Sequence, residues 1–265
     1  MELHKTLDVC CRFTTGKLLE SGLSGYVVGL SGGIDSALSA AIAVRALGAQ
    51  KLLAVIMPYR LTPSRATEDA ISLAKSLGVE YRVIDISPMI DAYFPVSDYA
   101  LRLRIGNKMA RERMSILFDL AQSMSHLVLG TSNRTEIALG YSTWYGDSAC
   151  SVNPIGQLYK SDVRALAQFL DIPESIRTKA PSAELWHGQT DEGEIGVTYD
   201  VLDRLLERIL DDGVTSMAML EKEGFDRPQV SRVVSMINRT SYKRSQPAVV
   251  PLGRVPIPDR IQLAE

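Results

Sequence analysis

Apolar residues along this chain occur in two recurring patterns, short continuous runs and longer stripes with a helical period. The short runs, at 26–30, 51–57, 81–86 and 126–129, have the length and the apolar content of buried strands. The stripes, at 3–21, from 34 onward, at 64–77 and at 97–123, are typical of helices that cover a core. Their alternation predicts an α/β fold, with a parallel sheet and helices on both faces.

The chain after Asp162 follows a different, mostly helical pattern. Helices are expected at 161–170, 197–211 and 226–239, with loops between them. The segment 178–196 has little periodicity and contains glycine and acidic residues, so we expect a lid loop that becomes ordered when nucleotide binds. The proline-rich tail 247–265 is expected to be extended. No linker is evident, which favours a single domain over 1–265.

The turn after the first predicted strand carries the most chemistry. Strand, glycine turn and helix follow one another at 26–44, with Gly32 and Gly33 in the turn. This geometry aims backbone N–H groups and a helix N-terminus at a phosphate, and Ser31 and Ser36 would add hydroxyl groups. Asp35 would then hold a Mg²⁺ ion that bridges phosphate oxygens. The alternative is an ordinary turn in which Asp35 caps the helix.

Other polar residues follow the predicted strand ends. The carboxyl ends near residues 30, 57 and 130 should converge on one ligand site. Glu136, one turn into the helix after the last strand, would share the metal with Asp35 or only complement the helix dipole. Lys160 would be a surface lysine or a point charge on phosphate. Asn107 and Arg111 lie on one face of the long helix, which is either a solvated basic face or a site for a polyanion.

Composition narrows the class of protein. The net charge is -2, from 29 Lys and Arg against 31 Asp and Glu, so a nucleic-acid or membrane surface is not expected. No apolar run reaches about 18 residues and no signal-peptide core is present, which favours a cytoplasmic protein. The three cysteines form no C-x-x-C pair, which argues against a structural zinc site and a disulfide framework.

Taken together, these segments resemble NAD synthetase of the ammonia-dependent type, a member of the Rossmann-like pyrophosphatase-loop ATPases. The matching motifs lie, in order, at 31–36, 58–70, 106–111, 130–136, 145–147, 160, 179–185, 191–196 and 243–244. The first motif alone would also fit GMP synthetase, asparagine synthetase or tRNA-lysidine synthetase. The later motifs, in this order, are far more selective.

The resemblance implies conversion of deamido-NAD to NAD. ATP transfers AMP to the nicotinate carboxylate and releases pyrophosphate, and ammonia then displaces AMP. The ATP contacts it implies are Ser31, Gly32, Gly33, Asp35, Ser36, Arg60, Thr131, Lys160 and Ser182. Those to deamido-NAD are Asn107, Arg111, Asp147, Glu194 and Lys243. Asp35 and Glu136 would hold Mg²⁺, and Asp35, Asp147 and Lys160 would be catalytic.

The sequence also gives expectations for the nitrogen donor of the reaction and for the oligomeric state. The first strand begins near residue 26, which leaves no room before it for a cysteine-based glutaminase, so free or separately supplied ammonia is expected. The resemblance also implies a homodimer through 97–123, whose apolar stripe is Leu101, Ile105, Met109, Ile116 and Leu120. The alternative is that the stripe is buried inside the monomer. The alternatives are another adenylating ligase subunit of this loop family or a non-catalytic nucleotide-binding regulator.

Overall fold

A four-stranded parallel sheet forms the centre of the computed structural model, which describes residues 2–94, 99–180, 191–250 and 252. The strands are β1 (Gly25–Gly29), β2 (Leu52–Ile56), β3 (Glu80–Val83) and β4 (His126–Leu129). They lie in the order β3-β2-β1-β4, and each neighbouring pair is parallel. The strand order reverses between β1 and β4, which is where α/β sheets bind ligands. The predicted Rossmann-like α/β class is confirmed.

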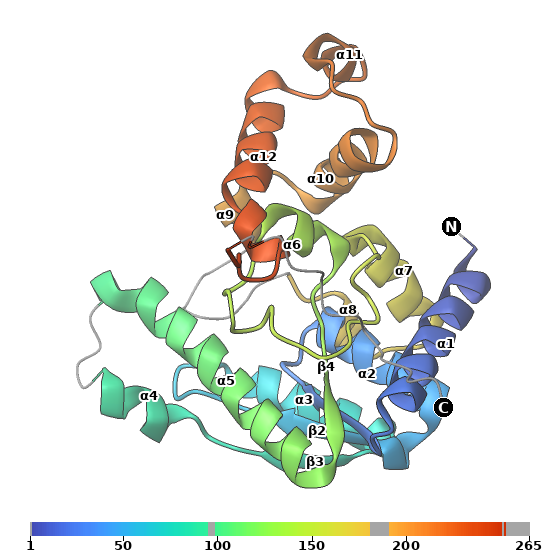
Figure 1. Ribbon diagram of the computed structural model, residues 1–265, viewed down its shortest axis with the longest axis vertical. Coiled ribbons are helices and arrows are strands. Elements are labelled where there is room, and N and C mark those ends of the chain that lie inside the picture. Colours follow the sequence, from blue (N-terminus) through green and yellow to red (C-terminus); the bar gives the residue numbers. More distant parts are fainter. Residues whose placement is uncertain (1, 95–98, 181–190, 251, 253–265) are drawn as a thin grey trace.

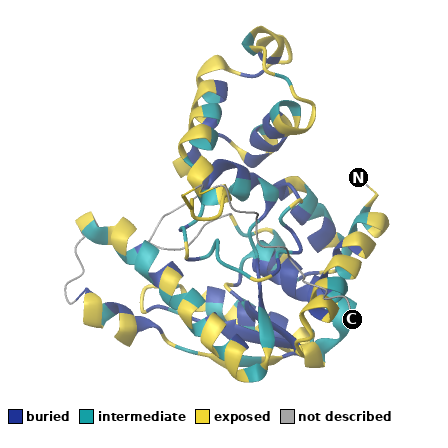
Figure 2. Ribbon diagram, in the orientation of Figure 1, coloured by how far each residue is buried: buried dark blue, intermediate teal, exposed yellow. Residues whose placement is uncertain are grey.

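Helices pack on both faces of this sheet (Figure 1). One face carries α1 (Leu3–Ser21), α2 (Ile34–Leu47), α3 (Ser64–Ser76), α7 (Lys160–Phe169) and α8 (Glu174–Arg177). The other carries α4 (Ser87–Tyr93) and α5 (Arg102–Met124). Within β1, Tyr26 and Val28 point to the first core and Val27 to the second. Because both faces of β1 and β2 are buried, these strands appear in the sequence as continuous apolar runs (Figure 2).

The C-terminal part adds a third apolar core, built mostly from helices. It comprises α6 (Arg134–Leu139), α9 (Asp191–Ile195), α10 (Tyr199–Leu206), α11 (Met217–Lys222) and α12 (Arg227–Arg239), with a π-helical turn at Glu207–Asp211. These helices form the upper part of the molecule in Figure 1. The predicted helical C-terminal part is therefore confirmed, while the single domain stays a prediction.

Several boundaries differ from the expectation. β3 ends at Val83 rather than 86, because Asp85 accepts hydrogen bonds from the backbone N–H (2.8 Å) and the hydroxyl of Ser87 and turns the chain into α4. The helices α4, α8 and α11 were not predicted. They have four to seven residues, which is too short for a helical period to show in the sequence. Residues 191–195, predicted as loop, form α9. Residues 181–190 of the predicted lid 178–196 and most of the tail lie outside the described residues.

The long helix begins at Arg102, after a 3₁₀ turn at Tyr99–Leu101, rather than at 97. Its expected dimer stripe packs mainly inside the monomer, since Met109 is 1% exposed and its neighbours in the stripe are half-buried against the same core. Leu103 and Phe118 are the large apolar side chains that this helix leaves exposed. In the part of the chain that the structure describes, no helix is long and apolar enough to span a membrane.

Candidate active site

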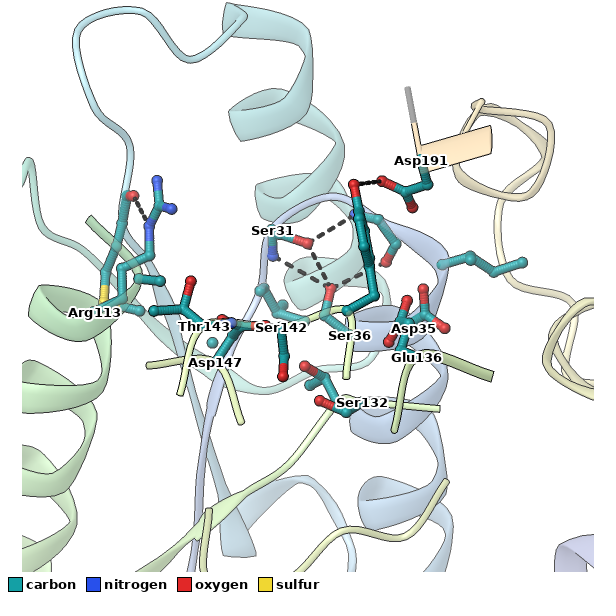
Figure 3. A pocket seen from close by; sticks show the side chains of 18 of the residues that line it. Ser31, Asp35, Ser36, Arg113, Ser132, Glu136, Ser142, Thr143, Asp147 and Asp191 are labelled. Atoms are coloured by element: carbon teal, nitrogen blue, oxygen red, sulfur yellow. Dashed lines mark hydrogen bonds between the residues drawn. The ribbon is translucent and has the colours of Figure 1, made fainter. Parts of the chain in front are cut away.

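A cavity of about 540 Å³ opens at the carboxyl ends of β1, β2 and β4. Its wall includes the residues that follow these strands, together with parts of α5, α6 and α7 and the loop 140–147 (Figure 3). The predicted convergence of the strand ends on one site is confirmed. A cavity of this size and position matches a site for a nucleotide or another small ligand.

The turn between β1 and α2 has the geometry of an anion site. Gly32 has a φ of +78°, and a Cβ atom there would lie 2.4 Å from the carbonyl oxygen of Ala66, so only glycine fits. The Ser36 hydroxyl donates to the carbonyl of Gly33 (3.0 Å), and the Gly33 N–H donates to the Ser31 hydroxyl (3.2 Å). These bonds hold the turn and the N-terminus of α2 open toward the cavity.

Asp35, Glu136 and Lys160 form a buried charge cluster beside that turn. The Lys160 ammonium donates to Asp35 (Nζ–Oδ2 2.5 Å) and lies 3.7 Å from Glu136 Oε1. Figure 3 shows the two carboxylates close together in the cavity wall. The Lys160 side chain is only 3% exposed, and one positive charge here faces two carboxylates. The N-cap of α2 is Gly33, and Asp35 bonds to Asn133 and Lys160 instead of to a backbone N–H of the helix, so the capping alternative for Asp35 is wrong.

The ionisation of the cluster follows from its burial. Burial and the charge of Asp35 raise the pKa of Glu136 to about 8, although Lys160 acts in the opposite direction. Burial opposes the charge of Lys160, but Asp35 and Glu136 outweigh it and raise the pKa of the ammonium. The cluster therefore has an excess of acidic groups that a further cation would relieve.

Asn133 fixes the two carboxylates relative to each other. Its side-chain oxygen accepts from the backbone N–H of Glu136 (2.9 Å), and the backbone N–H of Asn133 donates to Glu136 Oε2 (3.1 Å), which completes a capping box. Its amide group also donates to Asp35 Oδ1 (2.9 Å). Asn133 was not predicted as a site residue, although the Asn-x-x-Glu spacing is the signature of such a box.

A second polar group lies at the other end of the cavity. Thr143 connects Asn107 and Asp147. Its hydroxyl donates to Asn107 Oδ1 (2.8 Å), and its backbone N–H donates to Asp147 Oδ1 (2.8 Å). Lys243 donates to the carbonyls of Gly140 (2.8 Å) and Ser142 (2.6 Å). Burial raises the pKa of Asp147 and lowers that of Lys243. Thr143 was not predicted, because a loop threonine carries no distinctive pattern.

Two tyrosines surround a buried aspartate between these groups. Asp191 is 4% exposed and accepts from the hydroxyls of Tyr141 (3.1 Å) and Tyr199 (3.2 Å). The Tyr141 hydroxyl also donates to Glu194 (2.6 Å). These bonds join α9 and α10 to the cavity wall. Glu194 was predicted as a site residue, whereas Tyr141, Asp191 and Tyr199 were not.

The structure brings most of the predicted site residues to one cavity and leaves a few apart. The cavity wall contains Ser31, Gly33, Asp35, Ser36, Asn107, Thr131, Glu136, Asp147, Lys160, Glu194 and Lys243. Arg60 lies off this wall and pairs with Asp91 (2.8 Å), and Arg111 donates to the carbonyl of Trp144 (3.2 Å) from outside it. Ser182 lies outside the described residues.

A parallel sheet with a glycine turn and a charge cluster at the strand ends defines a nucleotide-binding protein of Rossmann-like fold. The model of the NAD synthase family matches residues 6–247. The chain belongs to this family.

Curated relatives cover nearly the whole chain. One from Fusobacterium nucleatum, named NH(3)-dependent NAD(+) synthetase, is 45% identical over 96% of both chains. Another of that name, from Methanosarcina mazei, is 46% identical over 94% of this chain and 98% of its own length.

Solved structures give the same fold. One described as an NMN synthetase from Francisella tularensis has a TM-score of 0.81 and 34% identity, and the match covers 95% of this chain and 99% of that one. The NH3-dependent NAD synthetase from Campylobacter jejuni has a TM-score of 0.80 and 33% identity, covering 94% and 99%.

Proposed function

We propose that this protein is an ammonia-dependent NAD synthetase that acts in the cytoplasm. It amidates deamido-NAD to NAD through an acyl-adenylate and releases AMP and pyrophosphate. The observation that carries the proposal is the cluster of Asp35, Glu136 and Lys160 beside the glycine turn at the switch point of the sheet. The names of the curated relatives support this choice over another adenylating ligase or a non-catalytic regulator.

The turn after β1 would bind the phosphates of ATP. Its N–H groups and the hydroxyls of Ser31 and Ser36 surround the N-terminus of α2, where negative charge is favoured. Lys160 would add a point charge as the departing pyrophosphate gains negative charge. Because the ammonium is buried, its interaction with phosphate is stronger than that of a surface lysine.

Asp35 and Glu136 fit the requirements of a Mg²⁺ site. Mg²⁺ is usually held by one or two carboxylates, with substrate phosphates and water completing the coordination. Among the described residues, no larger group of acidic, His or Cys side chains is arranged to hold a metal alone, so the phosphates would have to supply the remaining ligands. When bound, the ion would neutralise charge on the phosphate oxygens.

The far end of the cavity would bind deamido-NAD. Asn107, Asp147 and Lys243 meet there through the loop 140–147, with Glu194 nearby and Arg111 at the outer side. Burial lowers the pKa of Lys243, and an anionic substrate bound beside it would favour its charged form. With ATP at the turn, this arrangement would bring the nicotinate carboxylate toward the α-phosphate.

The products test the proposal directly. With ATP, Mg²⁺, ammonium and deamido-NAD, we expect NAD, AMP and pyrophosphate in equal amounts, and with glutamine as the sole nitrogen source we expect no NAD. Nicotinate mononucleotide should be tested in parallel, since the Francisella structure is described as an NMN synthetase. ADP as the nucleotide product, or efficient use of glutamine by the purified chain, would contradict the proposal.

We further propose a homodimer that pairs through α5, as the family resemblance implies. Because the predicted stripe packs inside the monomer, the pairing face would be the one that exposes Leu103 and Phe118. Phe118→Glu should then give a monomer by light scattering at micromolar concentration. Phe13→Glu on α1 is the matched control, since both side chains are 42% exposed. A wild-type protein that is monomeric and fully active would contradict this prediction.

A further inference from the structure

Asp203 is a buried carboxylate outside the cavity wall with an unusual pair of partners. It lies on α10, is 5% exposed, and accepts from the hydroxyl of Thr135 (2.6 Å) and from the backbone N–H of Ser161 (2.7 Å). Thr135 is the second residue of α6, and Ser161 the second of α7. One carboxylate thus holds the N-termini of two helices, where negative charge is also favoured by the helix dipoles.

The threonine extends this contact to Lys160. Its Oγ1 accepts from the backbone N–H of Lys160 (3.1 Å), and Thr135 itself is fully buried. Because the hydroxyl donates its proton to Asp203, its lone pairs are oriented toward that N–H. The residue after Thr135 is Glu136, so the chain of bonds joins the backbones of two of the three members of the charge cluster, Glu136 and Lys160.

The same helix also contacts the side chain of Lys160. Tyr199 precedes Asp203 by one turn of α10, and its ring centre lies 5.2 Å from Lys160 Nζ. Helix α10 therefore reaches Lys160 twice, at its backbone through Asp203 and Thr135 and at its ammonium through Tyr199.

From these contacts we infer that Asp203 is a positioning residue for the proposed reaction: it fixes Lys160 relative to Glu136 and so transmits the position of α10 to the phosphate site. The inference rests on the proposed function for the role of Lys160. A displacement of about 1 Å at a reacting group can slow catalysis by about a hundredfold, so a bond that sets this spacing is expected to matter for rate.

Asp203→Asn tests this role, because it keeps the volume and removes one strong acceptor. We expect kcat to fall about tenfold or more and ATP affinity, measured by calorimetry, to weaken about tenfold, with the KM for deamido-NAD changed less than about twofold. Thr135→Val should act in the same way, and the double variant should be no worse than either single one. Thr135→Ser, which keeps the hydroxyl, should restore activity.

Asp200→Asn is the matched control, since Asp200 lies on the same helix with a side chain 83% exposed and pairs with Arg164 at the surface. It should leave kcat, ATP affinity and melting temperature unchanged. If Asp203→Asn lowers only the melting temperature, while the folded enzyme keeps its kcat and ATP affinity, Asp203 is merely structural. Additive effects of Thr135→Val and Asp203→Asn would also overturn the inference.

The outcomes separate this inference from the proposed function. A wild-type protein that forms no NAD would refute the function, while ATP binding by the four variants would still decide whether Asp203 positions Lys160. If Asp203→Asn does not fold, the comparison of Thr135→Val with Thr135→Ser tests whether the contact with Asp203 positions Lys160.

Discussion

Replacement of Lys160 by methionine is expected to abolish the reaction and to destabilise the protein. The Lys160 side chain is 3% exposed and its ammonium is the partner of two carboxylates, so its removal leaves Asp35 and Glu136 facing each other without compensation. Breaking a buried ion pair in this way destabilises a fold by about 3–5 kcal/mol. Loss of one preorganised charge at the phosphates should slow adenylation about a thousandfold.

Two measurements check this expectation separately. Denaturant unfolding gives the change in the free energy of unfolding, and AMP formation below the melting temperature gives the change in rate. Lys17→Met is the control, because Lys17 pairs with Glu20 at 2.7 Å on the surface of α1 and should matter little to either quantity. A folded Lys160→Met enzyme that keeps more than about a tenth of wild-type activity would show that Lys160 is not the phosphate cation.

The sheet could be predicted from the sequence because its strands are buried on both sides. Residues 26–30 and 52–56 are continuous apolar runs, and each lies in the sheet with helices above and below. The turn at Gly32 could also be predicted from the sequence. Its positive φ and its contact with Ala66 allow only glycine, so the requirement is visible in the residue type. What the sequence could not supply is strand order, which depends on contacts between distant segments.

The site was predictable as a set of residues but not as a network. Asp35, Glu136 and Lys160 were all identified, yet the position of the ammonium between the two carboxylates is a tertiary fact. Asn133 bonds to a residue 98 positions earlier, and Asp203 to one 68 positions earlier. Local patterns carry no information about partners this far apart, so residues that orient others were missed.

The α5 stripe shows how one pattern can be used in two ways. The apolar period correctly predicted a helix, but such a stripe does not specify whether its own monomer or a partner covers it. Here the sheet covers Met109 and Leu117, and the exposed Leu103 and Phe118 lie elsewhere on the helix. Most of the apolar stripe is therefore buried by the monomer itself.

Replacement of Asp35 by asparagine is expected to separate activity from stability. The substitution keeps the volume and leaves an amide oxygen for the bond from Asn133, while Lys160 keeps Glu136 as its partner. It removes the like charge beside Glu136 but leaves Lys160 with one carboxylate, so the free energy of unfolding should fall by less than the about 3–5 kcal/mol expected for Lys160→Met. Adenylation should nevertheless fall about a thousandfold, which corresponds to about 4 kcal/mol, because a metal ligand and its charge are lost.

The pKa of Glu136 provides a readout of this variant that does not depend on activity. Burial and Asp35 together raise it to about 8 in the wild type, so removal of the Asp35 charge should lower it, as measured by NMR titration of the glutamate carboxyl. Asp200→Asn, which removes an exposed carboxylate, should leave both this pKa and the rate unchanged. An Asp35→Asn enzyme with near wild-type activity would refute the role of Asp35 as a metal ligand. An unchanged pKa of Glu136 would show that the two carboxylates do not interact.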